Sequence, residues 1–246
     1  MNFSTQHIAQ GPVSHIESRY ECIVLAGGLG TRLRSAVPDL PKCMAPVNGK
    51  PFLNYIIRYA LSQGVTDFIF SLGYMHELIE DYLKLHHPTL HYKIVIEEEP
   101  LGTGGAILLA SRQAQQKNVM VMNGDTLFKV NLPALMDFHE QHQSDITLAL
   151  KPMRNFERYG VVQINQENHV QHFQEKKYYD AGLINGGVYV LHLPNFHQIQ
   201  FPEKFSFEKD YLEKYVGSIK MMGLIQEGYF IDIGIPEDFE RAGREL

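Results

Sequence analysis

Leu25-Ala26-Gly27-Gly28-Leu29-Gly30-Thr31-Arg32-Leu33 is the stretch that decides the fold, because it leaves the apolar run Cys22 to Leu25 and precedes Pro41-Lys42. Small residues let a backbone turn tightly around an anion with its N–H groups aimed inward. Arg32 and Lys42 add fixed positive charge beside that turn. The segment therefore predicts a cradle for a polyphosphate at the end of a buried strand.

Two common phosphate-binding loops do not fit this segment. A dinucleotide fingerprint needs G-x-G-x-x-G, and in the window from Gly28 the last glycine is replaced by Leu33. A Walker loop ends in Gly-Lys-Ser or Gly-Lys-Thr, and neither tripeptide occurs in the chain. The cradle is therefore of another kind.

Size and composition bound the class of protein. A chain of 246 residues with 44% hydrophobic content can bury one substantial core, so we expect one domain over residues 20–246. The net charge is −6 and the lysines and arginines are scattered, which argues against nucleic acid as a partner. No stretch resembles a secretory signal or a membrane span, so we expect a cytoplasmic protein with no membrane partner.

The first 19 residues are polar and mixed. We expect them to be a disordered leader, as chain termini often are. A contact in a homo-oligomer is the alternative, and the oligomeric state stays open. Cys22 and Cys43 are too few for a disulfide framework, and we expect Cys22 to be buried in a strand.

The histidines do not predict a metal site. His139-Glu140-Gln141-His142 is one residue short of the zinc-protease pattern H-E-x-x-H, and the other histidine pairs lack partners at ligand spacing. We expect the histidines to lie at the surface.

Strand and helix patterns alternate through the first half of the chain. Short apolar runs predict buried strands at Cys22 to Leu25, Phe68 to Leu72, Tyr92 to Ile96 and Val119 to Met122. Helical spacing lies between them, and further helices fit the segments after Gly105, from Leu132 to His142 and from Pro236 to Arg244. This alternation predicts an α/β fold with a doubly wound, mainly parallel, Rossmann-like sheet that binds ligands at the carboxyl ends of its strands.

The pattern changes later in the chain. Gly160 to Ile164, Val170 to Phe173 and Val188 to Leu191 alternate at short spacing with few helix signals. We expect a small β-rich part laid against the first half.

Two aspartates follow apolar strands. Asp125 comes after Val119 to Met122, and Asp232 comes after Tyr229-Phe230-Ile231. Two strand-end carboxylates can share Mg²⁺, which prefers hard oxygen ligands and completes its shell with phosphate oxygens and water. The alternative is that each aspartate only caps a turn.

The phosphate loop, Pro41-Lys42 and several later motifs together resemble the sugar-1-phosphate nucleotidyltransferases, whose pattern is similar to L-A-G-G-x-G-T-R-L, a spacer and P-K. The resemblance covers residues 20 to 246. It continues, in chain order, through Ala45-Pro46-Val47, Lys50-Pro51-Phe52, Glu99-Pro100-Leu101-Gly102-Thr103-Gly104-Gly105, Asn123-Gly124-Asp125-Thr126, Tyr159-Gly160-Val161, Glu175-Lys176, Ile184-Asn185-Gly186-Gly187 and Phe230-Ile231-Asp232-Ile233-Gly234.

The resemblance implies an enzyme of nucleotidyl transfer, in which a sugar 1-phosphate attacks the α-phosphorus of a nucleoside triphosphate and releases pyrophosphate. A phosphate monoester with a second pKa of about 6 is already mostly a dianion at neutral pH, so no general base is required. The implied catalytic residues are Arg32, Lys42, Asp125 and Lys176, and Mg²⁺ would be held by Asp125 and Asp232. Lys176 would contact the sugar phosphate.

Binding roles follow from the same resemblance. The implied nucleotide-binding residues are Leu25, Ala26, Gly27, Gly28, Gly30, Thr31, Arg32, Lys42, Glu99, Gly102, Thr103, Gly104 and Gly124. The implied sugar-binding residues are Gly160, Glu175, Lys176, Asn185 and Gly186. For the segment from Leu101 to Gly105, the alternative is a plain helix N-terminus with Thr103 as its cap.

Within the family, the runs from Leu101 to Ile107 and from Phe230 to Asp238 most resemble the guanylyltransferases that use D-glycero-α-D-manno-heptose 1-phosphate and GTP to make GDP-heptose for surface glycans. Cys43 departs from relatives, which usually carry proline there. Guanylyl transfer to mannose 1-phosphate, and thymidylyl or cytidylyl transfer to glucose 1-phosphate, are the alternative activities. A catalytically silent regulatory subunit is an alternative of another class, although it would be expected to lose Asp125, Asp232, Arg32 or Lys42, and all four are present.

Overall fold

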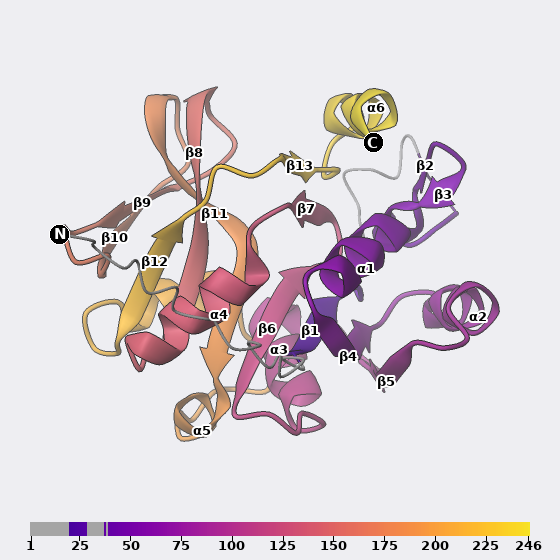
Figure 1. Ribbon diagram of the computed structural model, residues 1–246, viewed down its shortest axis with the longest axis horizontal. Coiled ribbons are helices and arrows are strands. Elements are labelled where there is room, and N and C mark those ends of the chain that lie inside the picture. Colours follow the sequence, from indigo (N-terminus) through magenta and orange to yellow (C-terminus); the bar gives the residue numbers. More distant parts are fainter. Residues whose placement is uncertain (1–19, 29–36, 38) are drawn as a thin grey trace, which may run out of the picture.

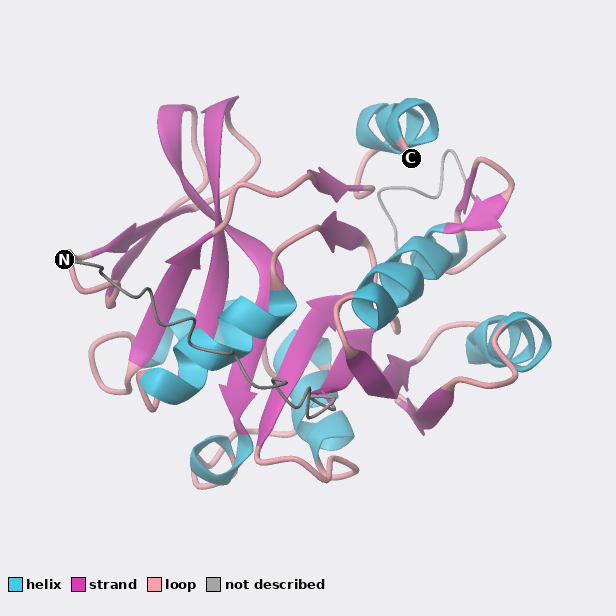
Figure 2. Cartoon of the chain, viewed as in Figure 1, coloured by secondary structure: helices cyan, strands magenta, loops and turns pink. Residues whose placement is uncertain are grey.

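The described chain is built around one central β-sheet. The computed structural model describes residues 20–28, 37 and 39–246, so the leader expected over residues 1–19 lies outside the described residues. In the described chain, nine strands form one mixed sheet in the order β10-β9-β11-β6-β1-β4-β5, with β8 paired to β11 and β12 paired to β8. Strands occupy the middle of the molecule and helices flank them (Figure 2).

The first half of the chain builds the parallel part of this sheet. β1 (Tyr20–Leu25) pairs in parallel with β4 (Val65–Leu72) and with β6 (Asn118–Asn123), and β5 (His91–Ile96) extends the sheet beyond β4. The connecting helices are α1 (Phe52–Ser62), α2 (His76–His86) and α3 (Gly102–Ser111). The four strands expected from the apolar runs are confirmed, with ends that differ by a few residues.

The chain changes its direction of travel across the sheet at β1. From β1 it moves outward to β4 and β5, and then α3 returns it to β6 on the other side of β1 (Figure 1). This reversal creates a switch point between the carboxyl ends of β1 and β6, where open α/β sheets bind ligands.

Hydrophobic clusters cover both faces of the sheet. Along β1, Cys22 and Val24 belong to one cluster, and Ile23 belongs to the other, as expected of a strand buried on both faces. The first cluster includes side chains of α1, α2 and α4 (Leu132–Gln141). The second includes side chains of α3, α5 (Leu193–Phe196) and the π-helix η2 (Phe207–Glu213). The expectation of a doubly wound sheet is therefore confirmed.

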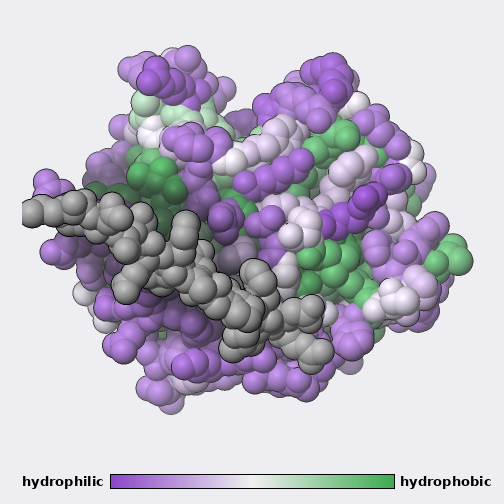
Figure 3. Space-filling view, viewed as in Figure 1, coloured by the Kyte–Doolittle hydropathy of each residue, from purple (hydrophilic) through white to green (hydrophobic). Residues whose placement is uncertain are grey.

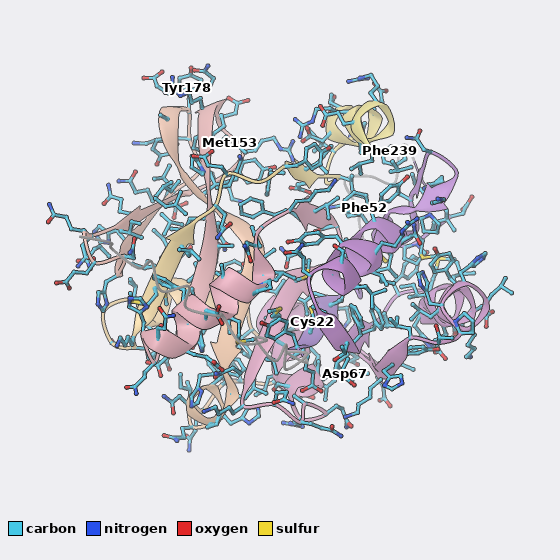
Figure 4. All side chains as sticks on the ribbon, viewed as in Figure 1. Cys22, Phe52, Asp67, Met153, Tyr178 and Phe239 are labelled. Carbon is cyan, nitrogen blue, oxygen red and sulfur yellow. The ribbon has the colours of Figure 1, made fainter. Side chains whose placement is uncertain are left out.

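The second half of the chain adds antiparallel strands to the same sheet. They are β8 (Ile146–Phe156), β9 (Val161–Ile164), β10 (Val170–Gln174) and β11 (Tyr179–His192), while β12 (Met221–Ile225) runs parallel to β8. β11 joins the halves, because it pairs antiparallel with both β6 and β8. Tyr178 stands at the outer tip of this β-rich part and is 59% exposed (Figure 4).

Several short elements lie above the carboxyl ends of the parallel strands. They are the 3-10 turn η1 (Lys42–Met44), β2 (Pro46–Val47), β3 (Lys50–Pro51), β7 (Thr126–Phe128), β13 (Phe230–Asp232) and α6 (Pro236–Glu245). β7 and β13 form a separate antiparallel ribbon in which Asp232 lies opposite Thr126. α6 packs through Phe239 on the cluster that contains Phe52 (Figure 4).

His139 is not at the surface, contrary to the expectation for the histidines. It is 1% exposed, and its ring Nδ1 lies 2.9 Å from the Thr147 hydroxyl. Leu132, Leu135 and Met136 of α4 are also buried, and residue 139 falls on the same face of the helix because helical neighbours recur every three or four residues. Burial lowers the pKa of His139 to about 4.

Hydrophilic residues cover most of the face in Figure 3, with separate hydrophobic areas between them. Within residues 20–28, 37 and 39–246, none of the helices has the length and apolar character needed to cross a membrane.

Candidate active site

A pocket of about 370 Å³ opens at the switch point between β1 and β6. Its walls come from the ends of those strands, from η1, from the start of α3 and from the turn that follows β13. The lining residues are Leu25, Ala26, Gly27, Gly28, Lys42, Cys43, Glu97, Pro100, Gly102, Thr103, Ala106, Asn123, Gly124, Asp125 and Gly234.

The strand ends meet closely enough to require glycine at two positions. The Gly124 N–H donates to the Leu25 carbonyl at 2.8 Å, and a Cβ on Gly124 would lie 2.6 Å from that same oxygen. A Cβ on Gly27 would lie 2.8 Å from a carboxylate oxygen of Glu97. The hydrogen bond joins the ends of β1 and β6, and the absence of side chains on both glycines leaves their backbone on the pocket wall.

The first part of the predicted phosphate loop lines the pocket. Leu25, Ala26, Gly27 and Gly28 are all on its wall. The predictions for Gly30, Thr31 and Arg32 fall on residues outside the described part of the chain.

Lys42 lies between the two predicted metal ligands. Its Nζ is 2.5 Å from Asp125 Oδ2 and 3.5 Å from Asp232 Oδ1. The lysine side chain is only 12% exposed, so its charge is balanced locally by these carboxylates. Asp232 also accepts a 2.8 Å hydrogen bond from the Gly234 N–H. Asp232 therefore caps its turn, as the simpler interpretation expects, and faces Lys42 as well.

The two carboxylates suit a magnesium ion shared with a substrate. Both converge on a single cationic group, Lys42, and carboxylate oxygens are ligands that Mg²⁺ prefers. Among the described residues, no group of three or more His, Cys, Asp or Glu side chains could hold a metal by itself. Asp125 and Asp232 therefore fit an ion that takes its remaining ligands from phosphate oxygens and water.

A second cation reaches Asp232 from the loop between β8 and β9. Arg158 lies 3.5 Å from Asp232 Oδ2 and also binds Asp238. The neighbouring Tyr159 hydroxyl donates to Asp232 at 3.3 Å. No pattern in the sequence pointed to Arg158, although this residue directly precedes the Tyr159-Gly160 motif.

Glu97, rather than Glu99, lies on the pocket wall. The structure places Glu99 in an exposed position outside the lining. The Glu97 carboxylate accepts hydrogen bonds from the Ser71 hydroxyl at 3.1 Å and from the Leu101 N–H at 3.2 Å. Burial raises its pKa, and those two hydrogen bonds partly oppose the rise. The sequence offers three consecutive glutamates, and only the turn into α3 decides which of them faces the pocket.

The small residues at the start of α3 have two roles: some line the pocket, and others allow close packing. Gly102 and Thr103 line the pocket, whereas a Cβ on Gly104 would lie 2.2 Å from the ring of Phe205. Gly104 is therefore required for packing. Thr103 is not the helix cap, because its hydroxyl accepts from the Phe207 N–H at 2.9 Å and donates to Glu208 at 2.8 Å.

None of the five predicted sugar-binding residues lines this pocket. Glu175 and Lys176 are exposed beyond the end of β10, and a Cβ on Gly160 would press against the Gln174 carbonyl at 2.5 Å. Asn185 donates to the Tyr189 hydroxyl at 2.8 Å, and a Cβ on Gly186 would lie 2.2 Å from the Phe128 ring. The next residue, Gly187, approaches the pocket, because a Cβ there would lie 2.6 Å from the amide of Asn123. These residues lie where the pairing of β11 with β8 is interrupted.

Cys43 is buried in η1 beside Lys42 and lines the pocket. Its Sγ lies 3.9 Å from the Ala26 carbonyl. Burial raises the pKa of this thiol to about 12. The thiol is therefore neutral at physiological pH and is not an activated nucleophile.

Fold and site together define a nucleotidyltransferase, with a glycine-lined strand end, a buried lysine and two carboxylates at the switch point of an α/β sheet. The model of the nucleotidyl transferase family matches residues 21–246, and the chain belongs to this family.

Two relatives resemble nearly the whole chain. It is 50% identical over 226 residues to D-glycero-alpha-D-manno-heptose 1-phosphate guanylyltransferase of Aneurinibacillus thermoaerophilus, covering 92% of this chain and 98% of that protein. It is 43% identical to the enzyme of the same name from Campylobacter jejuni, covering 89% and 96%. The crystal structure of HddC from Yersinia pseudotuberculosis superposes with a TM-score of 0.84 at 37% identity, covering 92% of this chain and 99% of that one. That protein has also been solved in complex with GMP-PN.

Proposed function

We propose that this protein transfers GMP from GTP to D-glycero-α-D-manno-heptose 1-phosphate, giving GDP-heptose and pyrophosphate. The observation that carries the reaction type is the convergence of Lys42, Asp125 and Asp232 at the switch-point pocket. The identity of base and sugar is supported by the 50% and 43% identical guanylyltransferases, which align over nearly their whole length.

The reaction needs charge neutralisation and alignment more than proton transfer. An oxygen of the sugar phosphate forms a bond to the α-phosphorus of GTP, and the bond from that phosphorus to the pyrophosphate oxygen breaks. A phosphate dianion is already nucleophilic at neutral pH, so a general base is not required. Lys42 meets the negative charge that develops on the transferring phosphoryl group. Arg32 and Lys176 are proposed, from the family resemblance alone, to bind the pyrophosphate and the sugar phosphate.

Asp125 and Asp232 are proposed to hold Mg²⁺. When bound, the ion would supply positive charge to the phosphate oxygens and help to orient the triphosphate. Lys42, which pairs with both carboxylates in the described structure, would then be free to contact the triphosphate.

Glu97 is proposed to select the base. Guanine presents donors at N1 and N2, and a carboxylate on the pocket wall can accept both. Thymine and cytosine lack that pair of donors. The hydrogen bonds from Ser71 and Leu101 fix the orientation of Glu97.

The proposed activity is tested by assaying every combination of nucleoside triphosphate and sugar phosphate. Purified protein is incubated with each of four nucleoside triphosphates and with heptose, mannose or glucose 1-phosphate, and pyrophosphate release is measured. We expect the highest kcat/KM for GTP with the heptose phosphate. A higher value for mannose 1-phosphate would overturn the sugar assignment, a higher value for another nucleotide would overturn the base assignment, and no release with any pair would favour a silent regulatory subunit.

A further inference from the structure

A second hollow, of about 880 Å³, lies beside α1 and shares no lining residue with the candidate active site. It is bounded by the β2–β3 turn, by α1, by β7 and the residues that follow it, and by the end of the described chain. β7 lies next to α1 in Figure 1. The lining residues are Asn48, Lys50, Asn54, Tyr55, Arg58, Tyr59, Ser62, Gln63, Leu127, Lys129, Val130, Asn131 and Leu246.

The side chains around this hollow are cationic. Lys50 of β3, Arg58 of α1 and Lys129, which directly follows β7, are all exposed to solvent. No aspartate or glutamate is among the lining residues. In the described part of the chain, none of the three forms an ion pair, although Lys129 lies 5.3 Å from the ring centre of Tyr229. In a chain of net charge −6, this concentration of unpaired cations favours an anionic ligand.

A buried amide faces the same hollow without a partner. Asn54 is only 8% exposed, lines the hollow, and makes no side-chain hydrogen bond in the described structure. The amide can donate and accept, so a ligand with hydroxyl, carbonyl or amine groups would satisfy it.

The walls of the hollow are braced by hydrogen bonds that need no ligand. The Tyr55 hydroxyl donates to the Val47 carbonyl at 3.0 Å, which ties α1 to β2. The Tyr59 hydroxyl donates to the Val130 carbonyl, which ties α1 to the segment after β7. The hollow is therefore a preformed site, as small-molecule sites usually are.

We propose that this hollow binds a small phosphorylated molecule, with its phosphate at Arg58 and Lys129 and its polar body at Asn54, and that occupancy alters turnover through β7. β7 begins at Thr126, directly after Asp125, and pairs with β13, which carries Asp232. A ligand that contacts Leu127 and Lys129 thus acts on the strand that positions both carboxylates. The ligand class is a phosphate ester of a sugar or a nucleoside.

Calorimetry on the full chain tests the site with inorganic phosphate, glucose 1-phosphate and GMP as probes. We expect phosphate binding to stay within twofold in Lys42→Ala and to weaken at least tenfold in the Arg58→Ala/Lys129→Ala double variant. Lys84→Ala/Lys117→Ala removes the same charge elsewhere and should bind phosphate as the unchanged protein does.

Asn54→Leu tests the amide. It should weaken binding of the probes that carry a sugar or base and leave the affinity for inorganic phosphate within twofold. Glucose 1-phosphate and GMP then distinguish a sugar from a nucleoside ester.

The proposed site would be refuted if the protein bound no phosphate, or if the control double variant lost as much phosphate affinity as Arg58→Ala/Lys129→Ala. It would also be refuted if only Lys42→Ala lost phosphate affinity. The coupling is tested by steady-state turnover with saturating probe, where we expect at least a twofold change that the Arg58→Ala/Lys129→Ala variant lacks. The same change in both proteins would overturn the coupling. The binding arm needs no turnover, so its outcome is independent of the proposed function.

Discussion

At the scale of single residues, the ammonium group of Lys42 organises the candidate active site. It contacts carboxylates from the β6–β7 turn and from the end of β13. Because Lys42 is nearly buried while it makes these contacts, its position is fixed before a substrate arrives, and preorganised charge is the largest source of catalysis in many enzymes.

Lys42→Ala should lower kcat by about 100-fold or more, on the scale of about 3 kcal/mol for the loss of one preorganised contact to the transition state. Steady-state pyrophosphate release measures the effect. Lys117→Ala, which removes an exposed lysine, is the control and should retain normal turnover. Near-normal turnover in Lys42→Ala would show that this lysine does not meet the transferring phosphate.

Substitution of Asp125 tests whether this carboxylate holds the metal ion. Asp125→Asn should bind divalent cations more weakly and lose orders of magnitude in turnover, because a neutral amide contributes less charge to Mg²⁺ than a carboxylate does. Electron paramagnetic resonance of Mn²⁺ measures binding without turnover. Excess chelator should abolish activity of the unchanged protein, and full activity under chelation would refute the assignment.

Base selection by Glu97 is tested by the same substitution at Glu97 and, as a control, at Glu99. Glu97→Gln should raise the KM for GTP and lower discrimination against ATP by about 10-fold or more, because an unmatched buried hydrogen bond costs about 1–3 kcal/mol. Glu99→Gln should leave both values unchanged, since Glu99 is exposed outside the pocket. kcat/KM for the two nucleotides is measured in both variants. The opposite result would return base selection to Glu99.

At the scale of elements, the loop between β8 and β9 is tied to the β13–α6 turn. Arg158 binds both Asp232 and Asp238, and its guanidinium lies 5.5 Å from the ring centre of Tyr159. Burial by itself lowers the pKa of Arg158, but the hydrogen bond to Asp238 and the nearby negative charges of Asp238 and Asp232 outweigh it, so the pKa is raised. This loop therefore couples the β-rich part of the molecule to a carboxylate of the candidate active site.

Arg158→Ala should weaken Mn²⁺ binding and lower the melting temperature, because Asp232 loses a positioning partner and α6 loses an anchor. Arg158→Lys keeps the charge without the two-pronged geometry, so it should recover part of the affinity. Calorimetric melting and Mn²⁺ titration separate the two effects. Unchanged Mn²⁺ affinity in Arg158→Ala would limit this arginine to a stabilising role.

At the scale of the whole molecule, His139 makes stability depend on pH. It is buried where α4 packs on β8, close to Thr147, and this burial lowers its pKa to about 4. In the unfolded chain a histidine has a pKa of about 6.5. The unfolded state therefore binds the extra proton between these two values, so stability is lost as the pH falls from about 6.5 to about 4.

His139→Gln should flatten that dependence, by up to about 1.4 kcal/mol per pH unit, which is the linkage for one proton. The free energy of unfolding in urea, measured from pH 4 to pH 8, checks the slope. His86→Gln replaces an exposed histidine and should keep the slope of the unchanged protein. An equal slope in His139→Gln would assign the acid sensitivity to other groups.

By itself the sequence determined the parallel half of the sheet, the pocket position and most of the pocket wall. Short apolar runs that lack polar alternation are typical of strands covered on both faces, and glycines directly after such a run indicate a tight turn. Gly27, Lys42, Asp125 and Asp232 were therefore predicted as site residues from local pattern and family resemblance.

Only the tertiary structure decided which neighbours share a contact. Glu97 faces the pocket because of the turn into α3, Gly104 is required by the distant Phe205, and Arg158 reaches Asp232 because β13 pairs with β7. Asn54 and Arg58 of α1 line one hollow with the distant Lys129 only because α1 packs beside β7. Local sequence fixes secondary structure through short-range sterics and periodicity, whereas these contacts depend on long-range packing that no local pattern encodes.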